Sequence, residues 1–234
     1  MNFGNQAVRS AYGTDEREGL SDFFRGVFTW MLLGLAITGI IAEFVSSDKP
    51  MVIFLSTHVL LFYLLIGLQL AAVLGLSFGI NKLPVVLSEI IFILYAALTG
   101  ITFSTIFLIY TAQSIGLVFF LTAFSFGLLA FIGYTTKKDL TSMGNFMMVG
   151  LIAIIVAMFI NFFLHSSTLM YIISILGVVI FLGLTAYDMQ KLKQIYLSGS
   201  FDERKETVLG ALTLYLDFIN LFLMLLNLFG QQRD

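Results

Sequence analysis

Seven apolar runs separated by short polar segments constrain this chain most strongly. They cover roughly residues 23–45, 59–78, 85–110, 114–134, 145–164, 169–191 and 207–229. A transmembrane helix needs about 20 predominantly apolar residues, so each run is long enough to span a bilayer. Only 11% of the residues are charged, whereas soluble domains carry about 25%. The sequence therefore predicts an all-α integral membrane protein with seven transmembrane helices.

The polar ends of the chain set the domain boundaries. Residues 1–22 carry charges such as Asp15 and Arg17 and lack the apolar core of a signal peptide. We interpret them as a cytoplasmic tail that is disordered or lies at the membrane interface. Residues 23–229 form the transmembrane domain, and residues 230–234 form a short C-terminal tail.

The second apolar run covers about 52–80 and is longer than one span needs, so its helical start is left open. Gly67, Ala71, Gly75 and Gly79 recur in it every four residues. Small residues at this spacing allow another helix to approach closely. We therefore expect this face to be a helix–helix contact.

The distribution of Lys and Arg predicts the orientation in the membrane. Cytoplasmic loops carry an excess of these residues. With seven spans, the side that holds the N-terminus carries ten of the twelve, and the other side carries only Lys49 and Arg233. The ten are Arg9, Arg17, Arg25, Lys82, Lys137, Lys138, Lys191, Lys193, Arg204 and Lys205. We predict a cytoplasmic N-terminus and a C-terminus outside.

Composition excludes several classes of protein. The chain has no Cys, which excludes disulfides and thiolate metal sites. Two His and one Trp leave little for a haem or zinc site, and a net charge of −2 gives no sign of a nucleic-acid partner. The sequence contains no Gly-rich phosphate loop, HExxH or nucleophile elbow. We expect neither an enzyme nor a bound cofactor.

The last apolar run carries an ionisable residue near its middle. At about 100° per residue, the helix places its small and polar residues on one stripe. The stripe consists of Gly210, Thr213, Asp217, Asn220 and Asn227. An acid inside a membrane span is a functional hypothesis by default, because an unpaired charge in hydrocarbon costs several kcal/mol. The stripe should therefore face the interior of the bundle.

A second intramembrane acid, Asp188, lies at a depth that matches Asp217. The sixth span ends at the cytoplasmic side, and Asp217 is about ten residues, or about 15 Å, along the seventh. The sixth span carries its own small and polar stripe, formed by Ser174, Gly177, Thr185 and Asp188. Two such stripes on consecutive antiparallel spans most simply face each other.

Two carboxyl groups in one low-dielectric site resist being ionised together. Such a pair shares a proton when protonated and separates when ionised, which is the physical basis of a pH switch. When ionised, Asp188 and Asp217 also offer hard oxygens suited to a transient Ca²⁺ site. The alternative is that each acid is satisfied by helix neighbours such as Asn220 or Tyr187, without titrating in the working range.

The remaining polar residues within or beside the spans carry weaker signals. Glu43 is interpreted as a solvated end residue, whereas Glu89 either reaches the surface or points inward. We expect Gln69 to bond across helices, and His58 to lie at the interface. Asn161 and His165, four residues apart, indicate a local hydrogen bond rather than a metal site.

Four segments of the chain resemble one family. They are AYDMQKL around Asp188, LTLYLDFINLFLMLLNLFG around Asp217, TKKDLTSMG at 136–144 and LTGITFS at 98–104. Together they resemble the Bax-inhibitor, or transmembrane Bax inhibitor motif, family, and its bacterial branch in particular. The resemblance covers nearly the whole chain from the first span onward.

The resemblance implies a central seventh helix surrounded by the other six, in a bacterial inner membrane. It implies a pH-sensitive Ca²⁺ leak that is controlled by the pair Asp188 and Asp217. In the closed state of the family the pair lies at the cytoplasmic end, and the seventh helix plugs the pore. Relatives often carry an Arg latch at the inner end of the second helix. The nearest match here is Lys82, which supplies charge without the bidentate fork of Arg.

Three hypotheses follow from the residues and the resemblance. The leading one is a pH-gated Ca²⁺ leak channel, with Lys82, Glu89 and Asn220 as candidates for the latch or the ion path. The second is a regulatory membrane protein that modulates a membrane-bound AAA protease, to which bacterial relatives are linked. The third, an intramembrane aspartyl protease, lacks the expected Gly-x-Gly-Asp context around Asp188 and Asp217.

Overall fold

The described part of the chain folds entirely into helices and their connections. The structure is a computed structural model that describes residues 3–199 and 202–233, with side chains from residue 18 onward. Its helices are α1 (Phe3–Ser47), α2 (Lys49–Thr57), α3 (Val59–Gly79), α4 (Val85–Phe103), α5 (Ile106–Ile109), α6 (Ala112–Thr135), α7 (Thr141–Leu164), α8 (Ser167–Ser198) and α9 (Glu203–Phe229). Within these described residues, seven stretches are long and apolar enough to cross a membrane, which confirms the predicted number of spans.

The long second apolar run divides at His58. Asp48 accepts a hydrogen bond from the Met51 backbone and caps the short helix α2, which ends at Thr57. His58 then adopts a non-helical conformation before α3 begins at Val59. The apolar surplus of this run is therefore a separate short helix beside the span, and the exposed His58 lies at the break between them.

Helices extend further into the polar segments than the sequence predicted. The polar segment between the apolar runs 169–191 and 207–229 shrinks to a connection at 199–202, because α8 continues to Ser198 and α9 starts at Glu203. Gly199 ends α8 with a φ of +67°, and the Asp202 carboxylate caps α9 by accepting from the Lys205 backbone. The N-terminal tail is likewise helical from Phe3 in continuity with the first span, while residues 1–2 lie outside the described part. This tail contains no proline to stop helix propagation.

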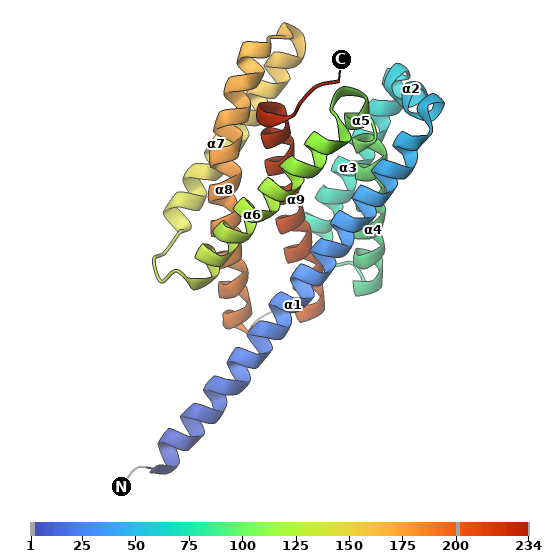
Figure 1. Cartoon of the computed structure of the whole chain (residues 1–234). Helices are drawn as coiled ribbons and strands as arrows, with labels where there is room; N and C mark the ends of the chain where they lie inside the picture. Colours follow the sequence, from blue (N-terminus) through green and yellow to red (C-terminus); the bar gives the residue numbers. More distant parts are fainter. Residues whose placement is uncertain (1–2, 200–201, 234) are drawn as a thin grey trace.

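α9 is the most enclosed span of the bundle (Figure 1). In its most apolar stretch 72% of the residues are buried, against 6% in α7 and 11% in α3. α9 packs against α8, α1, α6 and α4 and touches α3, whereas α7 packs on α8. Its buried side chains include Leu212, Leu214 and Leu221. α9 is thus the most buried of the seven spans, and most of the other spans contact it.

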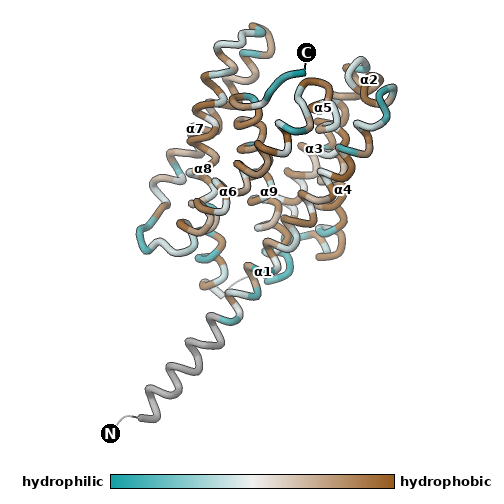
Figure 2. Tube along the Cα trace, viewed as in Figure 1, coloured by the Kyte–Doolittle hydropathy of each residue, from teal (hydrophilic) through white to brown (hydrophobic). Residues whose placement is uncertain are grey.

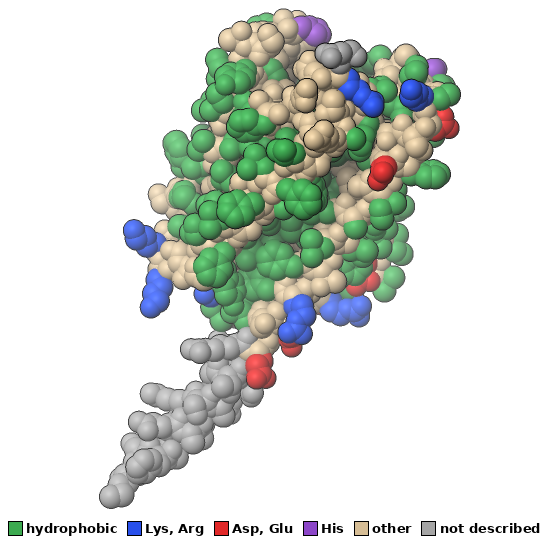
Figure 3. Space-filling model, in the orientation of Figure 1, with side chains coloured by type: hydrophobic (Ala, Val, Ile, Leu, Met, Phe, Trp, Pro, Cys, Tyr) green, Lys and Arg blue, Asp and Glu red, His purple; other side chains and the backbone are tan. Residues whose placement is uncertain are grey.

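The surface has the polarity of a membrane protein. Apolar segments make up most of the length of the bundle, and hydrophilic residues gather at its two ends (Figure 2). The face in Figure 3 is largely hydrophobic, and its basic side chains lie mainly at one end. That end, called the basic end below, carries the α3–α4, α6–α7 and α8–α9 connections. Apolar side chains facing outward, such as Phe120 and Phe159, are suited to contact with lipid.

The predicted contact face on the second span is wrong. Cβ atoms added at Gly67 or Gly75 would meet nothing within 4 Å, and a Cβ at Gly79 would contact only the nearby Leu83. Ala71 is also exposed. The spacing of small residues permits close helix packing, but a single sequence does not show whether a partner helix is present on that face.

Buried hydroxyl groups join three helices in the core. The Thr38 hydroxyl of α1 lies 2.6 Å from the Tyr215 hydroxyl of α9 and donates to the Ala96 carbonyl of α4 at 2.9 Å. Tyr215 is fully buried, and its ring also packs edge-on against Phe92 and Tyr95. This cluster fixes the rotation of α9 relative to α1 and α4.

We expect Tyr215→Phe to lower the free energy of unfolding by about 1 kcal/mol, the usual net value of one buried hydrogen bond. The ring packing stays, and the bond to Thr38 is lost. Chemical unfolding in detergent measures the change. Tyr171→Phe is the matched control, because Tyr171 is 55% exposed; equal effects of the two substitutions would contradict the role of the buried bond.

The C-terminal tail is tied to the α5–α6 connection. The Gln231 backbone donates to Ser114 Oγ at 2.7 Å and accepts from the Thr111 backbone at 3.0 Å. The Arg233 guanidinium donates to the Phe107 carbonyl at 2.8 Å. The described residues of the predicted tail at 230–234 thus anchor the far end of α9, and Asp234 lies outside the described part.

Candidate functional site

The polar stripes of α8 and α9 face each other, as the sequence predicted. Ser174 Oγ donates to Asn227 Oδ1 at 3.0 Å near the end opposite the basic end. Further along the interface, Gly177 leaves room for Met224, whose Sδ would lie 2.7 Å from an added Cβ. These contacts set the register of the two helices, and this register brings Asp188 and Asp217 to the same depth.

The carboxyl groups of Asp188 and Asp217 lie within hydrogen-bonding range of each other. Asp217 is 6% exposed, and among the described residues no amide or hydroxyl group donates to its enclosed Oδ2. Ionised carboxylates only accept hydrogen bonds. A hydrogen bond between these two groups therefore requires that they share a proton.

The neighbours proposed as alternative partners of the acids are engaged elsewhere. The Asn220 side-chain amide donates to the Leu216 carbonyl at 2.8 Å, within its own helix. Tyr187 packs its ring against Gly144, where a Cβ would collide with it. That the two acids act as a pair stays a prediction.

The pair lines a cavity of about 880 Å³ between α3 and α4 on one side and α7 and α8 on the other. The stripe residues Thr213, Asp217 and Asn220 of α9 form part of its wall. α3 and α7 lie across the cavity from each other, and their rings Tyr63 and Phe162 meet at 6.2 Å near the end opposite the basic end. The acids are therefore reached from a space between helices rather than from a sealed core.

Lys191 is the basic residue that lines the same cavity as the acids. Its ammonium group attracts the Asp188 carboxylate and lies 5.9 Å from the centre of the Tyr187 ring. From the sequence, Lys191 was only the last residue of the sixth span and one of the positive charges on the cytoplasmic side. Its position three residues after Asp188, on the same helix face, is the signal that identifies it.

Lys82, the predicted counterpart of the family's latch, lies in the exposed α3–α4 connection. It is not among the residues that line the cavity of Asp188 and Asp217. The structure thus brings Lys191, but not Lys82, to the two acids. A latching role of Lys82 stays a prediction.

Glu89 ties α4 to the start of α9. Its Oε1 lies 3.3 Å from Arg204 Nη2, and the side chains of Glu89 and Arg204 are 19% and 71% exposed. Beside this pair, Lys205 Nζ donates to the Asn81 carbonyl of the α3–α4 connection at 3.2 Å. Glu89 therefore neither lines the cavity nor remains unpaired, and it holds the basic end of α9 against α4.

We expect Glu89→Gln to loosen the first turns of α9 while changing overall stability by less than about 1 kcal/mol, because exposed ion pairs contribute little. Hydrogen–deuterium exchange in residues 203–209 should increase. Glu43→Gln removes a carboxylate from an exposed position of α1 and serves as the control. Unchanged exchange in Glu89→Gln would refute the proposed tie.

The α6–α7 connection is fixed next to Asp188. Gly133 lies directly against the backbone of Ala186, so close that a Cβ would collide with its carbonyl. The Gln190 side chain accepts from the Leu140 backbone and donates to the Lys138 carbonyl, both at 2.8 Å. The segment 136–144 thus supports α8 at the level of the two acids. Gln190 makes this contact, and nothing in the sequence indicated that role.

Asp139 belongs to this connection and is a surface carboxylate. Its Oδ1 accepts from Thr141 Oγ1 at 2.6 Å and from the Thr141 backbone at 2.9 Å. These hydrogen bonds, led by that of the hydroxyl group, hold the pKa of Asp139 below its usual value. Asp139 is consequently ionised throughout the neutral range and stabilises the start of α7.

The site carries few ligands for a metal ion. Among the described residues, no group of three or more His, Cys, Asp or Glu side chains gathers at one point. Ca²⁺ takes six to eight oxygen ligands, so two carboxylates leave most of its coordination to water or to other oxygens. This arrangement fits a passing ion better than a resident one.

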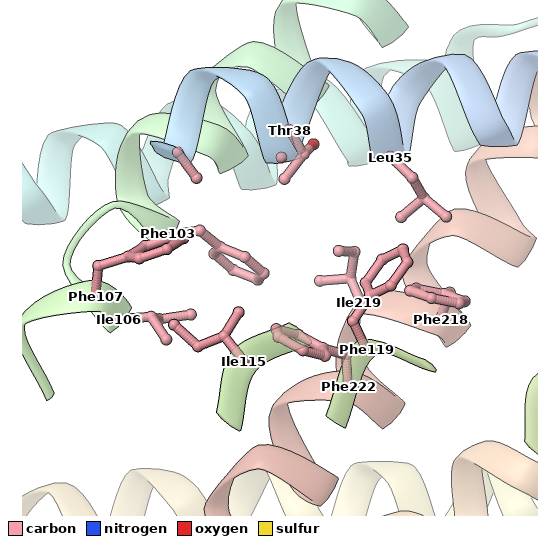
Figure 4. Close-up of a pocket in the computed structure, with 12 residues that line it drawn as sticks. Leu35, Thr38, Phe103, Ile106, Phe107, Ile115, Phe119, Phe218, Ile219 and Phe222 are labelled. Atoms are coloured by element: carbon pink, nitrogen blue, oxygen red, sulfur yellow. The ribbon is translucent and has the colours of Figure 1, made fainter. Parts of the chain in front are cut away.

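A second hollow on another side of α9 has different chemistry (Figure 4). It is about 90 Å³ in volume and is lined by apolar side chains of α1, α4, α5, α6 and α9, such as Phe103, Phe119 and Phe222. The polar lining residue Thr38 already bonds Ala96 and Tyr215. Polar chemistry in this part of the fold is therefore concentrated in the cavity of Asp188 and Asp217.

Comparison with known proteins places the chain in a family. A family profile described as "Inhibitor of apoptosis-promoting Bax1" matches residues 20–234. The chain belongs to this Bax inhibitor family. The match includes both acids and every span, and it confirms the resemblance drawn from the motifs around Asp188 and Asp217.

Relatives of this Bax inhibitor family member come from several bacteria. The "Inner membrane protein YbhL" of Escherichia coli (strain K12) is 46% identical over 93% of the chain and 94% of its own length. The "Uncharacterized protein RP147" of Rickettsia prowazekii is 40% identical over 93% and 92%. The "Uncharacterized protein YrjE" of Lactococcus lactis is 37% identical over 92% and 94%. The family and the seven apolar helices together show that this protein is a multi-pass membrane protein.

Proposed function

We propose that this protein is a pH-sensitive Ca²⁺ leak channel of the bacterial inner membrane, gated by Asp188 and Asp217. The observation that carries the proposal is the close approach of two carboxyl groups from α8 and α9 in one cavity, where the enclosed Asp217 Oδ2 receives no hydrogen bond from the described residues. The named relative of Escherichia coli, an inner membrane protein, supports the location. The excess of Lys and Arg at the basic end supports a cytoplasmic N-terminus and an outer C-terminus.

The gate follows from the protonation of the pair. With one shared proton, Asp188 and Asp217 are joined, and α9 stays packed in the bundle in a closed arrangement. When both carboxyls ionise as the pH rises, their repulsion in a low-dielectric site drives α8 and α9 apart. The ionised groups then present oxygens to a passing Ca²⁺ ion, with no resident metal or cofactor required.

The decisive experiment is Ca²⁺ flux into dye-loaded proteoliposomes over a pH series. We expect flux above that of empty liposomes, rising as the pH rises through the titration of the pair. Circular dichroism of the reconstituted protein controls for folding. Flux equal to that of empty liposomes at every pH, from folded protein, would overturn the proposal.

A second candidate function is regulation through a membrane partner, such as a membrane-bound AAA protease. It is favoured by the face of α3 that carries Gly67, Ala71 and Gly75, which is exposed. Small residues at this spacing accept a partner helix. Site-specific crosslinking from Ala71 in native membranes tests this function. Recovery of only lipid and monomer would count against it.

A further inference from the structure

The cavity of Asp188 and Asp217 is open toward the lipid between α3 and α7. α3 packs mainly on α4, and α7 packs on α8. The cavity-lining residues Leu70 of α3 and Ile155 of α7 are 58% and 57% exposed. A space of about 880 Å³ is large enough for an organic ligand, since ligand sites measure about 300–1,000 Å³. A molecule dissolved in the bilayer can enter here without crossing a polar barrier.

The cavity is polar at the basic end and apolar beyond it. Its polar end is lined by Asn145, Tyr187, Asp188 and Lys191. The remainder is lined by apolar residues such as Met158. Polar side chains further along have their donors occupied within the protein. Gln69 donates to the Leu98 carbonyl, and the Thr99 and Asn220 side chains donate within their own helices. The cavity therefore suits an amphiphile with its head at the basic end.

The charges at the polar end fit a zwitterion. The carboxyl groups of Asp188 and Asp217 line this end of the cavity and provide acceptors. Lys191 provides a positive charge three residues from Asp188. Asn145, which is exposed, adds an amide donor. An ammonium group can meet the carboxyls, while an adjacent phosphate meets Lys191 and Asn145.

The polar end of the cavity lies level with the α6–α7 connection. Gly133 contacts Ala186, and Gln190 bonds the Leu140 and Lys138 backbones of the α6–α7 connection. This connection leaves the apolar span and carries the exposed Lys137 and Lys138. A phospholipid of the leaflet at the basic end can therefore place its head beside Asp188 while its chains stay in the hydrocarbon region.

We propose that this cavity binds a phospholipid with a phosphoethanolamine head, which enters between α3 and α7. Its primary ammonium group donates to Asp188 and Asp217, its phosphate binds Lys191 and Asn145, and an acyl chain fills the apolar length beside Leu70. The binding goes beyond Ca²⁺ flux and does not depend on it. A bound lipid of this kind occupies the space that faces the polar stripe of α9.

Native mass spectrometry of delipidated protein in detergent tests the proposal. The probes are dioleoyl phosphatidylethanolamine, phosphatidylcholine and phosphatidylglycerol. We expect phosphatidylethanolamine to bind about tenfold more tightly than phosphatidylcholine, whose quaternary ammonium group has no N–H, because a charge-assisted hydrogen bond is lost. Phosphatidylglycerol, which has no ammonium group, should bind more weakly still. Equal affinity for the three lipids would overturn the proposal, as would equally tight binding of soluble glycerophosphoethanolamine.

Two variants locate the site. Leu70→Trp places a bulky ring at the cavity, whereas Leu74→Trp places it one turn away on α3 at a residue that is 54% exposed and is not among the lining residues. We expect about a tenfold loss of phosphatidylethanolamine binding in the first and none in the second. Lys191→Gln should weaken the binding of all three lipids, because each of them carries the phosphate. Unchanged binding in both Leu70→Trp and Lys191→Gln would place the lipid elsewhere and refute the site.

The same proteins in flux assays separate this proposal from the channel. If Ca²⁺ flux rises with pH but the protein binds the three lipids equally, the lipid site is refuted and the channel proposal is supported. Selective lipid binding without any flux would refute the channel and support the lipid site.

Discussion

Asp217→Asn is expected to abolish the rise of Ca²⁺ flux with pH. The amide of the new residue donates a hydrogen bond to Asp188 at every pH, so α8 and α9 stay joined and no second charge develops. At the alkaline end of the pH series, flux should fall about tenfold or more. A change of about 1.4 kcal/mol in the free-energy difference between the closed and open arrangements changes their ratio tenfold. The measurement is initial Ca²⁺ influx into dye-loaded proteoliposomes across the pH series.

The sign of this effect follows from proton binding. The closed arrangement holds a shared proton, and the open arrangement holds none, so raising the pH favours the open arrangement by linkage. Asp188→Asn should act like Asp217→Asn, and the double variant should add nothing, because each of the three removes the shared proton and the repulsion between two carboxylates. A double variant that still responds to pH would place the sensor elsewhere.

Asp139→Asn is the matched control for these substitutions. It makes the same chemical change at a carboxylate that is exposed in the α6–α7 connection. The hydrogen bonds from Thr141 lower the pKa of Asp139, so this group stays ionised across the neutral range and contributes no titration there. Its removal should leave the pH dependence of flux unchanged. A shift as large as that of Asp217→Asn would show that surface charge, rather than the buried pair, sets the response.

Much of the fold and the pairing of the acids could be predicted from sequence because both depend on local periodicity. Apolar length sets the number of spans. The 3.6-residue period places Asp217 with Thr213 and Asn220 on one stripe, and the short α8–α9 connection makes these helices antiparallel neighbours. Equal depth then follows from counting residues along each helix at about 1.5 Å each.

The cavity could not be predicted in this way, because it depends on which helices pack closely along their length and which do not. The gap between α3 and α7 arises from the packing of each helix on another partner. The same limitation explains why the small residues of α3 were misinterpreted: Gly67 and Gly75 have no neighbour within 4 Å of an added Cβ. The positions of Lys82 and Lys191 relative to the acids likewise depend on tertiary structure, whereas their charge is visible in the sequence.

The second large effect is expected at Gly133, where α6 crosses α8. A Cβ at this position would collide with the Ala186 carbonyl, which is backbone and cannot rotate away. Gly133→Ala should therefore push α6 off α8 and destabilise the protein by about 2 kcal/mol, as overpacked cores do. For a chain of this size the melting temperature should fall by about 4–8 °C. Gly133→Leu, with three more carbons, should prevent folding.

Gly127→Ala on the same helix separates packing from the intrinsic preference of the backbone. A Cβ at Gly127 would meet nothing within 4 Å, so this variant should be neutral or gain up to about 1 kcal/mol from the higher helix propensity of Ala. Thermal denaturation in detergent, followed by circular dichroism, measures both variants. Because Ala186 lies two residues before Asp188, a folded Gly133→Ala protein should also show an altered pH response of flux. Equal melting temperatures for the two variants would contradict the close crossing that holds α8, and with it Asp188, in place.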